Sequence, residues 1–272
     1  MPILNKDMTL CISLAARPSN LGTRFHNFLY DELGLNYVYK AFAPISLPDA
    51  IAGVRGLGIR GAAVSMPYKE DVIALLDGLD ESAAAIDSVN TVVNTDGRLI
   101  GHNTDYTAVR SLLTLHDVPA SHTFLLRGSG GMAKAVAAAL RDAGFARGTI
   151  IARNEEAGRA LAGLYGFDWH PTGAGLTADL LVNVTPLGMA GGADAEVLAF
   201  DAATVAEASV VFDVVAMPAV TPLLQAAQDA GVRVITGVEV AALQAEEQFV
   251  LYTGVRPRAD QVRRASEFSR EG

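Results

Sequence analysis

One segment near the middle of the chain constrains its fold more than any other. Residues 123–126 are mainly apolar, and Arg127 follows them before a Gly-Ser-Gly-Gly-Met-Ala run and an alanine-rich stretch. In this GxGxxA spacing, Gly128 permits a tight turn, Gly130 lets backbone N–H groups approach a pyrophosphate, and Ala133 leaves room for a helix to pack on a strand. The segment therefore predicts a buried strand that turns into a helix whose N-terminus binds dinucleotide phosphates.

Glycines at this spacing also occur at ordinary strand-to-helix corners, so the neighbouring sequence matters. The helix predicted over residues 132–143 ends at Gly144, and an apolar strand follows over residues 149–152. Strand, helix and strand then complete a βαβ unit of the expected length. This context favours the dinucleotide-binding interpretation, with the cofactor site made by Gly128, Ser129, Gly130, Gly131, Met132 and Ala133.

The end of the second strand indicates which dinucleotide is bound. Sites that prefer NAD usually place Asp or Glu there to bind the ribose 2′-hydroxyl, but this strand ends in Arg153 and Asn154. A guanidinium pairs with phosphate oxygens and stacks on adenine, so the sequence predicts NADP as the cofactor. We expect the following Glu155 and Glu156 to stabilise the first turn of the next helix through its dipole.

Composition excludes several other classes of protein. The 272 residues are 50% hydrophobic, enough for two domains at roughly 100–200 residues each. A formal net charge of −9 without a basic run argues against nucleic acid or an anionic membrane as partner. The single cysteine, Cys11, excludes an intramolecular disulfide and fits a cytoplasmic protein. The histidines lack ligand spacing, so we expect no metal site, and we expect His26 and His102 to make structural hydrogen bonds.

Hydrophobic periodicity and turn residues predict alternating helices and strands in both halves. The first half has expected strands at 9–14, 37–42, 61–65, 89–94 and 98–101, the last two joined by an Asp96-Gly97 turn, and helices at 23–33, 48–54, 67–76 and 81–86. The second half continues with strands near 179–184, 210–214 and 232–235, and a long helix at 238–252. No strand follows that last helix, so we expect it to pack on the first half.

Two segments carry groups that could move a proton while a hydride passes to a nicotinamide. Lys69 follows Ser65, Met66, Pro67 and Tyr68, and Asp105 follows Asn103 and Thr104. Taken alone, Lys69 could be an ordinary solvated lysine on the surface, and Asp105 could be a carboxylate that stabilises the start of a helix. The residues by themselves therefore leave both alternatives open.

In order and spacing, the motifs resemble the shikimate dehydrogenase family over nearly the whole chain. The matching segments are Met66-Pro67-Tyr68-Lys69-Glu70, Ser88-Val89-Asn90-Thr91, Asn103-Thr104-Asp105, the GxGxxA turn, Asn-Val-Thr-Pro-Leu-Gly-Met at 183–189, and Gln244. The resemblance implies an α/β fold with an N-terminal α/β substrate domain at residues 1–105, completed by a returning helical segment at 238–272. Residues 106–237 would form a Rossmann-type NADP-binding domain.

The resemblance also assigns roles to individual residues. Lys69 and Asp105 match the pair that shares proton transfer, and Arg153 matches the arginine that binds the 2′-phosphate. The substrate-binding positions are Asn20, Ser65, Asn90 and Gln244, and those on the nicotinamide side are Thr185, Val214 and Gly237. A small cyclic hydroxy acid is the implied partner, bound by a monomer or homodimer.

Several positions depart from the family pattern. Asn20 and Gly22 replace a serine pair that holds the substrate carboxylate, Ala63 replaces an asparagine, and Ala216 and Met217 replace Tyr-Asn. Ala157 stands where a second basic residue follows the 2′-phosphate arginine. The expected activity is thus NADP-dependent interconversion of shikimate, or a related cyclic hydroxy acid, and 3-dehydroshikimate. The alternatives are a quinate or aminoshikimate dehydrogenase and a non-catalytic NADP-binding regulator.

Overall fold

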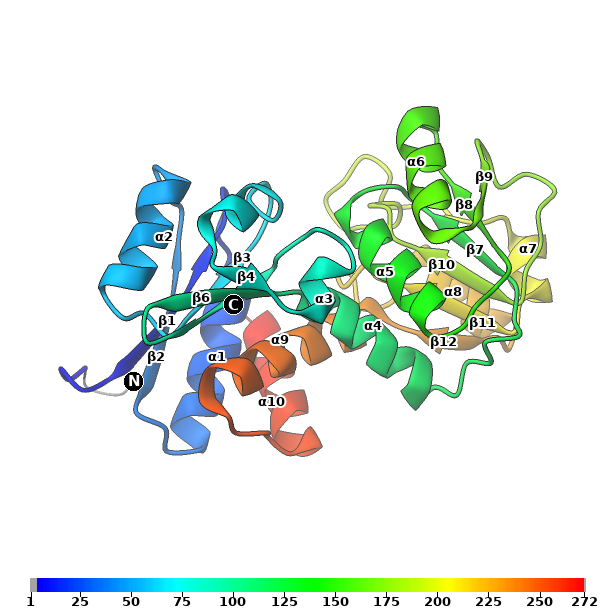
Figure 1. The fold of residues 1–272 in the computed structure, drawn as a ribbon. Helices are drawn as coiled ribbons and strands as arrows, with labels where there is room; N and C mark the ends of the chain where they lie inside the picture. The colour runs from blue at the N-terminus through cyan, green and yellow to red at the C-terminus, as the bar shows by residue number, and fades with distance from the viewer. Residues whose placement is uncertain (1–3, 272) are drawn as a thin grey trace. The chain divides into compact units, whose positions relative to one another are not determined.

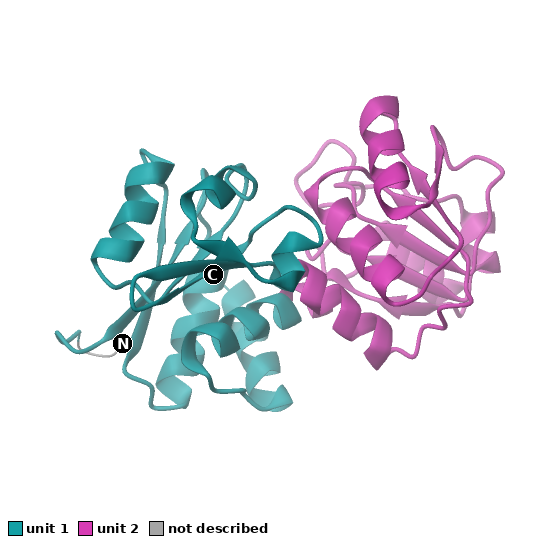
Figure 2. Ribbon diagram, viewed as in Figure 1, with its two compact units in different colours: residues 1–104, 242–272 teal, residues 105–241 magenta. Residues whose placement is uncertain are grey.

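The computed structural model describes residues 4–271, and the chain divides into two compact units (Figure 2). Unit 1 contains the residues up to Thr104 together with those from Ala242 onward, and unit 2 contains residues 105–241. Helix α4 (Thr104–Leu115) begins at the first boundary, and helix α9 (Gly237–Thr253) spans the second. The chain therefore leaves unit 1 once and later returns to it.

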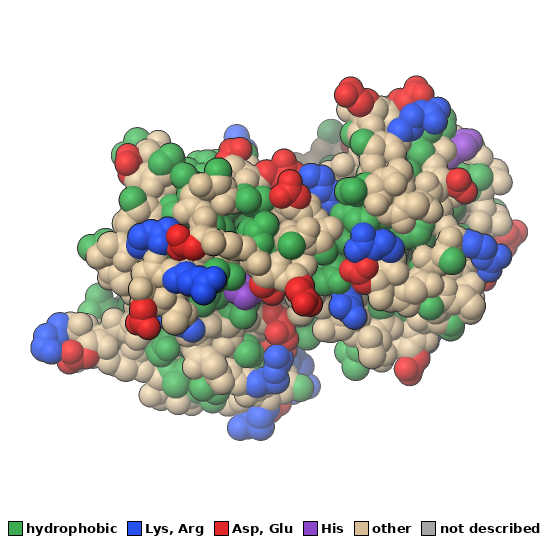
Figure 3. All heavy atoms as spheres, viewed as in Figure 1, with side chains coloured by type: hydrophobic (Ala, Val, Ile, Leu, Met, Phe, Trp, Pro, Cys, Tyr) green, Lys and Arg blue, Asp and Glu red, His purple; other side chains and the backbone are tan. Residues whose placement is uncertain are grey.

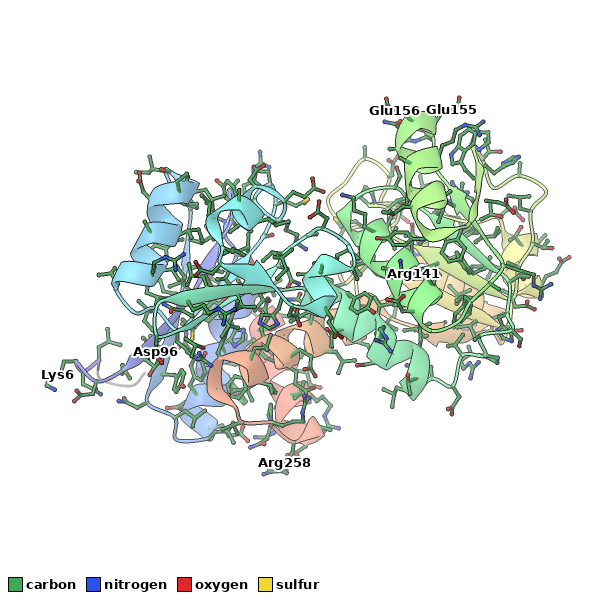
Figure 4. The ribbon with its side chains drawn as sticks, in the orientation of Figure 1. Lys6, Asp96, Arg141, Glu155, Glu156 and Arg258 are labelled. Carbon is green, nitrogen blue, oxygen red and sulfur yellow. The ribbon has the colours of Figure 1, made fainter. Side chains whose placement is uncertain are left out.

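Unit 1 is built on a six-stranded mixed sheet with strand order β2-β1-β3-β5-β6-β4 (Figure 1). Its strands are β1 (Thr9–Leu14), β2 (Tyr37–Phe42), β3 (Gly61–Val64), β4 (Gly78–Leu79), β5 (Thr91–Thr95) and β6 (Arg98–His102). Strand β1 is parallel to β2 and β3, whereas β5 is antiparallel to β3 and β6. Asp96, labelled in Figure 4, and Gly97 both have positive φ in the turn between β5 and β6, as the sequence predicted.

Helices cover both faces of this sheet. Successive side chains of a strand point to opposite faces, so Cys11 and Ile12 belong to different cores. The face of Ile12 packs against α2 (Leu47–Gly56) and the 3₁₀ helix η1 (Asp71–Leu75). The face of Cys11 packs against α1 (Leu21–Glu32), α9 and α10 (Ala259–Arg270). The predicted return of the C-terminal helical segment to the first half is confirmed.

The helix predicted over residues 67–76 is wrong. A cis peptide bond joins Met66 to Pro67, residues 67–70 form turns, and only η1 has helical geometry. The Lys69 carbonyl oxygen accepts a hydrogen bond from the backbone N–H of Val89 at 2.8 Å. This oxygen therefore bonds to the segment just before β5 (Thr91–Thr95) and not to a donor within a local α-helix. A short helix, α3 (Glu81–Ala84), follows.

Unit 2 contains a six-stranded, fully parallel sheet with strand order β12-β11-β10-β7-β8-β9. Its strands are β7 (Phe124–Arg127), β8 (Gly148–Ile151), β9 (Asp168–His170), β10 (Leu180–Asn183), β11 (Val210–Asp213) and β12 (Arg233–Ile235). The chain moves outward from β7 to β9 and then returns to build the other side from β10 to β12. The strand order thus reverses beside β7, and in such sheets ligands bind at the carboxyl ends of the strands at this point.

The helices of unit 2 also lie on both faces of the sheet. Leu125 faces α7 (Ala202–Glu207) and α8 (Pro222–Asp229), which complete one apolar core. Phe124 faces the other side, where it contacts Phe145 and Phe167 just after α5 (Gly131–Asp142) and α6 (Glu155–Tyr165). This is the predicted Rossmann-type arrangement.

Charged side chains of both signs are interspersed on the face drawn in Figure 3. Among residues 4–271, no helix combines the length and the apolar character needed to span a bilayer.

His26 lies in the core of unit 1, where its ring stacks on Tyr39 with 4.5 Å between centroids. Neither ring nitrogen has a hydrogen-bond partner, so the predicted structural hydrogen bond is absent. The reason is that rings surround the side chain: Phe25, Tyr30, Tyr39, Phe249 and Tyr252. Burial lowers the pKa of His26 to about 3, an effect that the Gln248 side chain opposes.

Acid is expected to destabilise the protein through His26. The unfolded chain takes up this proton near pH 6.5, whereas the native state takes it up only near pH 3. Stability from neutral His26 is therefore complete above pH 6.5 and is lost as the pH falls toward 3. We expect this group to lower the free energy of unfolding by up to about 1.4 kcal/mol per pH unit in that window. Urea unfolding of the wild type and His26→Phe at several pH values checks this, and an equal pH slope in both proteins would contradict it.

Candidate cofactor and substrate sites

The glycine-rich turn lies at the carboxyl end of β7, where the chain enters α5. Gly128 has a φ of +130°, and a Cβ there would lie 2.7 Å from a methyl carbon of Val184. Both the conformation and the space therefore require glycine at this position. A Cβ on Gly130 would meet nothing within 4 Å. The first N–H groups of α5 consequently adjoin open space in which a phosphate could accept their hydrogen bonds.

A cavity of about 960 Å³ lies beside this turn in unit 2. This volume is at the upper end of the range for small-molecule sites. The predicted cofactor residues that line the cavity are Gly128, Ser129, Gly130, Arg153, Asn154 and Thr185. Those that do not line it are Gly131, Met132, Ala133, Val214 and Gly237. Ala133 is fully buried, so it acts as the spacer between helix and strand.

Arg153 and Asn154 differ in what their side chains do. Arg153 is exposed at the end of β8 and lines the cavity. The Asn154 side chain instead accepts a hydrogen bond from the backbone N–H of Ala157 at 3.1 Å and caps α6. Glu155 and Glu156 stand exposed at the start of this helix, as Figure 4 shows. Their placement agrees with the predicted role in stabilising the first turn.

Arg127 also lines the cavity, although no role is predicted for it from the sequence. Its guanidinium lies 5.1 Å from the ring centroid of Phe200, and its buried Nε has no hydrogen-bond partner. Burial and the positive charge of Arg153 lower the pKa of Arg127, while Asp201 opposes them. A basic residue placed directly between a buried strand and a glycine turn was the available signal in the sequence.

A buried polar network joins the carboxyl ends of β10 and β11. Asp213 is fully buried, and its carboxylate accepts hydrogen bonds from Asn183 Nδ2 at 3.0 Å, the Val215 N–H at 3.1 Å and the Thr221 hydroxyl at 2.6 Å. Asn183 Oδ1 in turn accepts the Thr185 hydroxyl at 2.6 Å. Burial raises the pKa of Asp213, and these hydrogen bonds oppose the shift. The network fixes the Thr185 loop and the segment after β11.

Val214 and Gly237 belong to the same edge of unit 2. A Cβ on Gly237 would lie 2.4 Å from the backbone carbonyl carbon of Val215 and 2.5 Å from the Val214 oxygen. The start of α9 therefore packs directly on the backbone that follows β11. This close approach explains glycine at the position without any bound ligand.

In unit 1, three of the candidate substrate-side segments are held together around Asn90. Asn90 is buried, and its Oδ1 accepts hydrogen bonds from the Thr104 backbone N–H at 2.9 Å and the Thr91 hydroxyl at 2.8 Å. Its neighbour Val89 donates to the Lys69 carbonyl. Asn90 Nδ2 is buried without a hydrogen-bond partner. A buried amide donor is thus held next to the Lys69 turn and next to Thr104, the residue before Asp105.

The remaining candidates lie on β3, α4 and α9. Ser65 follows β3 and is exposed, while Asp105 is 9% exposed in the first turn of α4. Gln248, for which no role is predicted from the sequence, donates to the Thr91 hydroxyl at 2.9 Å. Gln244 precedes it by one helical turn, on the same side of α9.

A family model and a relative of known sequence both match this chain and indicate the same family. The family model of the shikimate dehydrogenase substrate binding domain matches residues 19–92. A shikimate dehydrogenase-like protein of Haemophilus influenzae is 50% identical over 268 residues, which cover 98% of this chain and 99% of the relative. The chain belongs to the shikimate dehydrogenase family.

Two similar solved structures contain bound ligands. Shikimate 5-dehydrogenase of Thermus thermophilus, in complex with NADP(H) and shikimate, is 32% identical with a TM-score of 0.87, and the match covers 96% of this chain and 100% of that one. Quinate dehydrogenase of Corynebacterium glutamicum, in complex with NAD, is 28% identical with a TM-score of 0.85 and coverage of 96% and 98%. The chain is thus similar in fold to enzymes with different named substrates and cofactors.

The start of α1 is one of the places where this chain departs from the family pattern. Asn20 is exposed, and its side chain does not cap the helix. A Cβ on Gly22 would lie 3.4 Å from the Tyr39 hydroxyl, and the Thr23 hydroxyl is buried without a hydrogen-bond partner. The Tyr39 hydroxyl therefore lies close to where a side chain at position 22 would stand.

Proposed function

We propose that this protein is an NADP-dependent oxidoreductase that interconverts shikimate, or a related cyclic hydroxy acid, and 3-dehydroshikimate by hydride transfer. The observation that carries the proposal is the amide of Asn90. Its Nδ2 is buried without a partner, a state that costs roughly 1–3 kcal/mol unless an acceptor fills it. A substrate hydroxyl supplies that acceptor beside the Lys69 turn.

In this proposal, Lys69 and Asp105 share the movement of the hydroxyl proton. Asn90 Nδ2 donates to a ring hydroxyl and fixes which carbon reacts. Ser65 and Gln244 add hydroxyl and amide contacts, and Asn20 with the hydroxyl groups near Gly22 binds the substrate carboxylate. Side chains that hold several hydroxyls discriminate strongly, because an analogue that lacks one leaves a buried polar group unpaired.

The residues of unit 2 fit the expected cofactor. The open side of Gly130 and the N-terminus of α5 would receive the pyrophosphate, and Arg153 would bind the 2′-phosphate. Thr185, Val214 and Gly237 would line the nicotinamide side, where the network around Asp213 holds their loops. Bound NADP⁺ supplies the hydride acceptor. The NADP(H) complex of the Thermus thermophilus relative supports this assignment.

A quinate or aminoshikimate dehydrogenase is the second candidate. The departures from the family pattern at Gly22, Ala63 and Ala216 motivate it, since they alter the contacts available to the carboxylate and to the ring substituents, at which these substrates differ. The quinate dehydrogenase of Corynebacterium glutamicum supports it as well. A non-catalytic NADP-binding regulator, by contrast, has no need of Lys69, Asp105 and the orphaned amide of Asn90.

The first test measures reduction of NADP⁺ and NAD⁺ by the purified wild-type protein at mildly alkaline pH with shikimate, quinate and an amino analogue. We expect turnover with at least one of these hydroxy acids and a higher kcat/KM with NADP⁺ than with NAD⁺. Turnover of quinate alone would assign the second candidate. Binding of NADP⁺ without turnover of any of them would contradict the enzyme and support the regulator.

A further inference from the structure

Two arginines face one cavity in unit 2 without a carboxylate paired to the inner one. Arg127 ends β7 in register with Ile151 of β8, and Arg153 lies two residues beyond Ile151. Both side chains line the cavity. Among residues 4–271, no carboxylate oxygen lies within ion-pair distance of Arg127, whose guanidinium rests on the Phe200 ring and whose Nε is buried and unpartnered.

This arrangement is unfavourable unless an anion is present. A half-buried guanidinium has lost part of its hydration, and an unsatisfied buried donor costs further free energy. Arg153 repels Arg127, and the acidic groups on this side are Asp194, which also lines the cavity, and Asp201, which attracts Arg127 more remotely. Protein groups therefore leave the inner cation without a direct counter-charge.

The site between Arg127 and Arg153 is separate from the site expected for the pyrophosphate. The pyrophosphate is expected at the open side of Gly130 and the first turn of α5, whereas Arg153 lies at the end of the next strand, β8. A phosphate monoester beside Arg153 carries up to two negative charges and several acceptor oxygens. These are enough to accept bidentate hydrogen bonds from two guanidinium groups.

We propose that Arg127 and Arg153 together bind the 2′-phosphate of NADP, so that Arg127 is a second determinant of the preference for NADP over NAD. This inference rests on the proposed function. It adds a residue from β7 to a subsite otherwise assigned to the segment after β8. Ala157, one turn into α6, contributes no charge of its own.

The test uses calorimetric titration of the full-length protein with adenosine 2′-monophosphate, adenosine 5′-monophosphate, NADP⁺ and NAD⁺. For Arg127→Met we expect binding of the two 2′-phosphorylated ligands to weaken at least about tenfold, and binding of the other two to change less than about twofold. Arg127→Lys keeps the positive charge but not the bidentate guanidinium. Its dissociation constants for the 2′-phosphorylated ligands should therefore lie between those of the wild type and the Met variant, and it provides a test even where the Met variant folds poorly. Arg159→Met is the matched control, because Arg159 also stacks on a ring, that of Trp169, but does not line the cavity.

Two outcomes would overturn the role of Arg127. One is an unchanged ratio of NADP⁺ to NAD⁺ affinity in both Arg127 variants. The other is an equal loss for all four ligands, which would assign Arg127 to a shared part of the nucleotide or to the cavity wall. A wild-type protein that binds neither dinucleotide would instead refute the proposed function.

Discussion

Lys69→Ala is expected to lower kcat by about 10²–10⁴-fold, the usual contribution of a positioned acid or base. The dissociation constant for NADP⁺ should change little, because Lys69 is not among the residues that line the cofactor cavity. Steady-state kinetics with the substrate found for the wild type, together with a direct titration of NADP⁺, separate the two effects. A selective loss of turnover would assign Lys69 to the chemical step.

The matched control for this experiment is Lys6→Ala. Lys6 is strongly exposed and pairs with its neighbour Asp7, so its removal should leave both kcat and cofactor binding unchanged. Asp105→Asn keeps the size of the second group and should also lower kcat if the pair acts together. Equal turnover in Lys69→Ala and the wild type would remove Lys69 from the mechanism.

Asp213→Ala should cause the largest loss of stability. The carboxylate accepts hydrogen bonds from Asn183, Val215 and Thr221 in a fully buried site. Its removal leaves the Val215 N–H and the Thr221 hydroxyl unpaired, whereas Asn183 Nδ2 keeps the Leu187 carbonyl oxygen at 3.3 Å as an acceptor. At roughly 1–3 kcal/mol for each of these two donors, we expect the free energy of unfolding to fall by about 2–6 kcal/mol. Urea unfolding measures this, and a loss below about 1 kcal/mol would contradict the network as described.

Two further variants serve as controls for the stability loss of Asp213→Ala. Asp213→Asn keeps an acceptor for the Val215 N–H and a similar shape, so it should cost less than the alanine variant. Asp229→Ala, at the exposed end of α8, removes a carboxylate that accepts a hydrogen bond from the Gln225 side chain and should change stability by less than about 0.5 kcal/mol. A loss confined to Asp213→Ala would assign the effect to the buried donors.

Local patterns were sufficient to predict the framework of both units. The glycine spacing at 128–133 and the two apolar strands around it predicted the βαβ unit, and the Asp96-Gly97 turn predicted the β5–β6 hairpin. These signals depend on neighbours in sequence, since a turn and a helix start are fixed by a few adjacent residues. Helix α10 was not predicted from hydrophobic periodicity, because several of its buried residues are polar: Gln261, Ser266 and Ser269.

The contacts that give the site its chemistry could not be predicted from local sequence patterns. The bonds from Thr104 to Asn90 and from Gln248 to Thr91 join distant parts of the chain, and only the folded sheet brings them together. Similarly, the turn at Lys69 depends on a donor from Val89. Whether a residue at the end of a strand, such as Arg127, faces a helix or a ligand also depends on the whole unit.

The division of the chain also sets an order for its assembly on the ribosome. Unit 2 is one continuous stretch, so its whole sheet can form while the nascent chain is still being extended. Unit 1 must wait, because Phe249, Tyr252 and Val262 fill the core that begins with Cys11. Trp169, the single tryptophan, lies in unit 2, so its fluorescence would report the early folding event and remain blind to the later closure of the first unit's core.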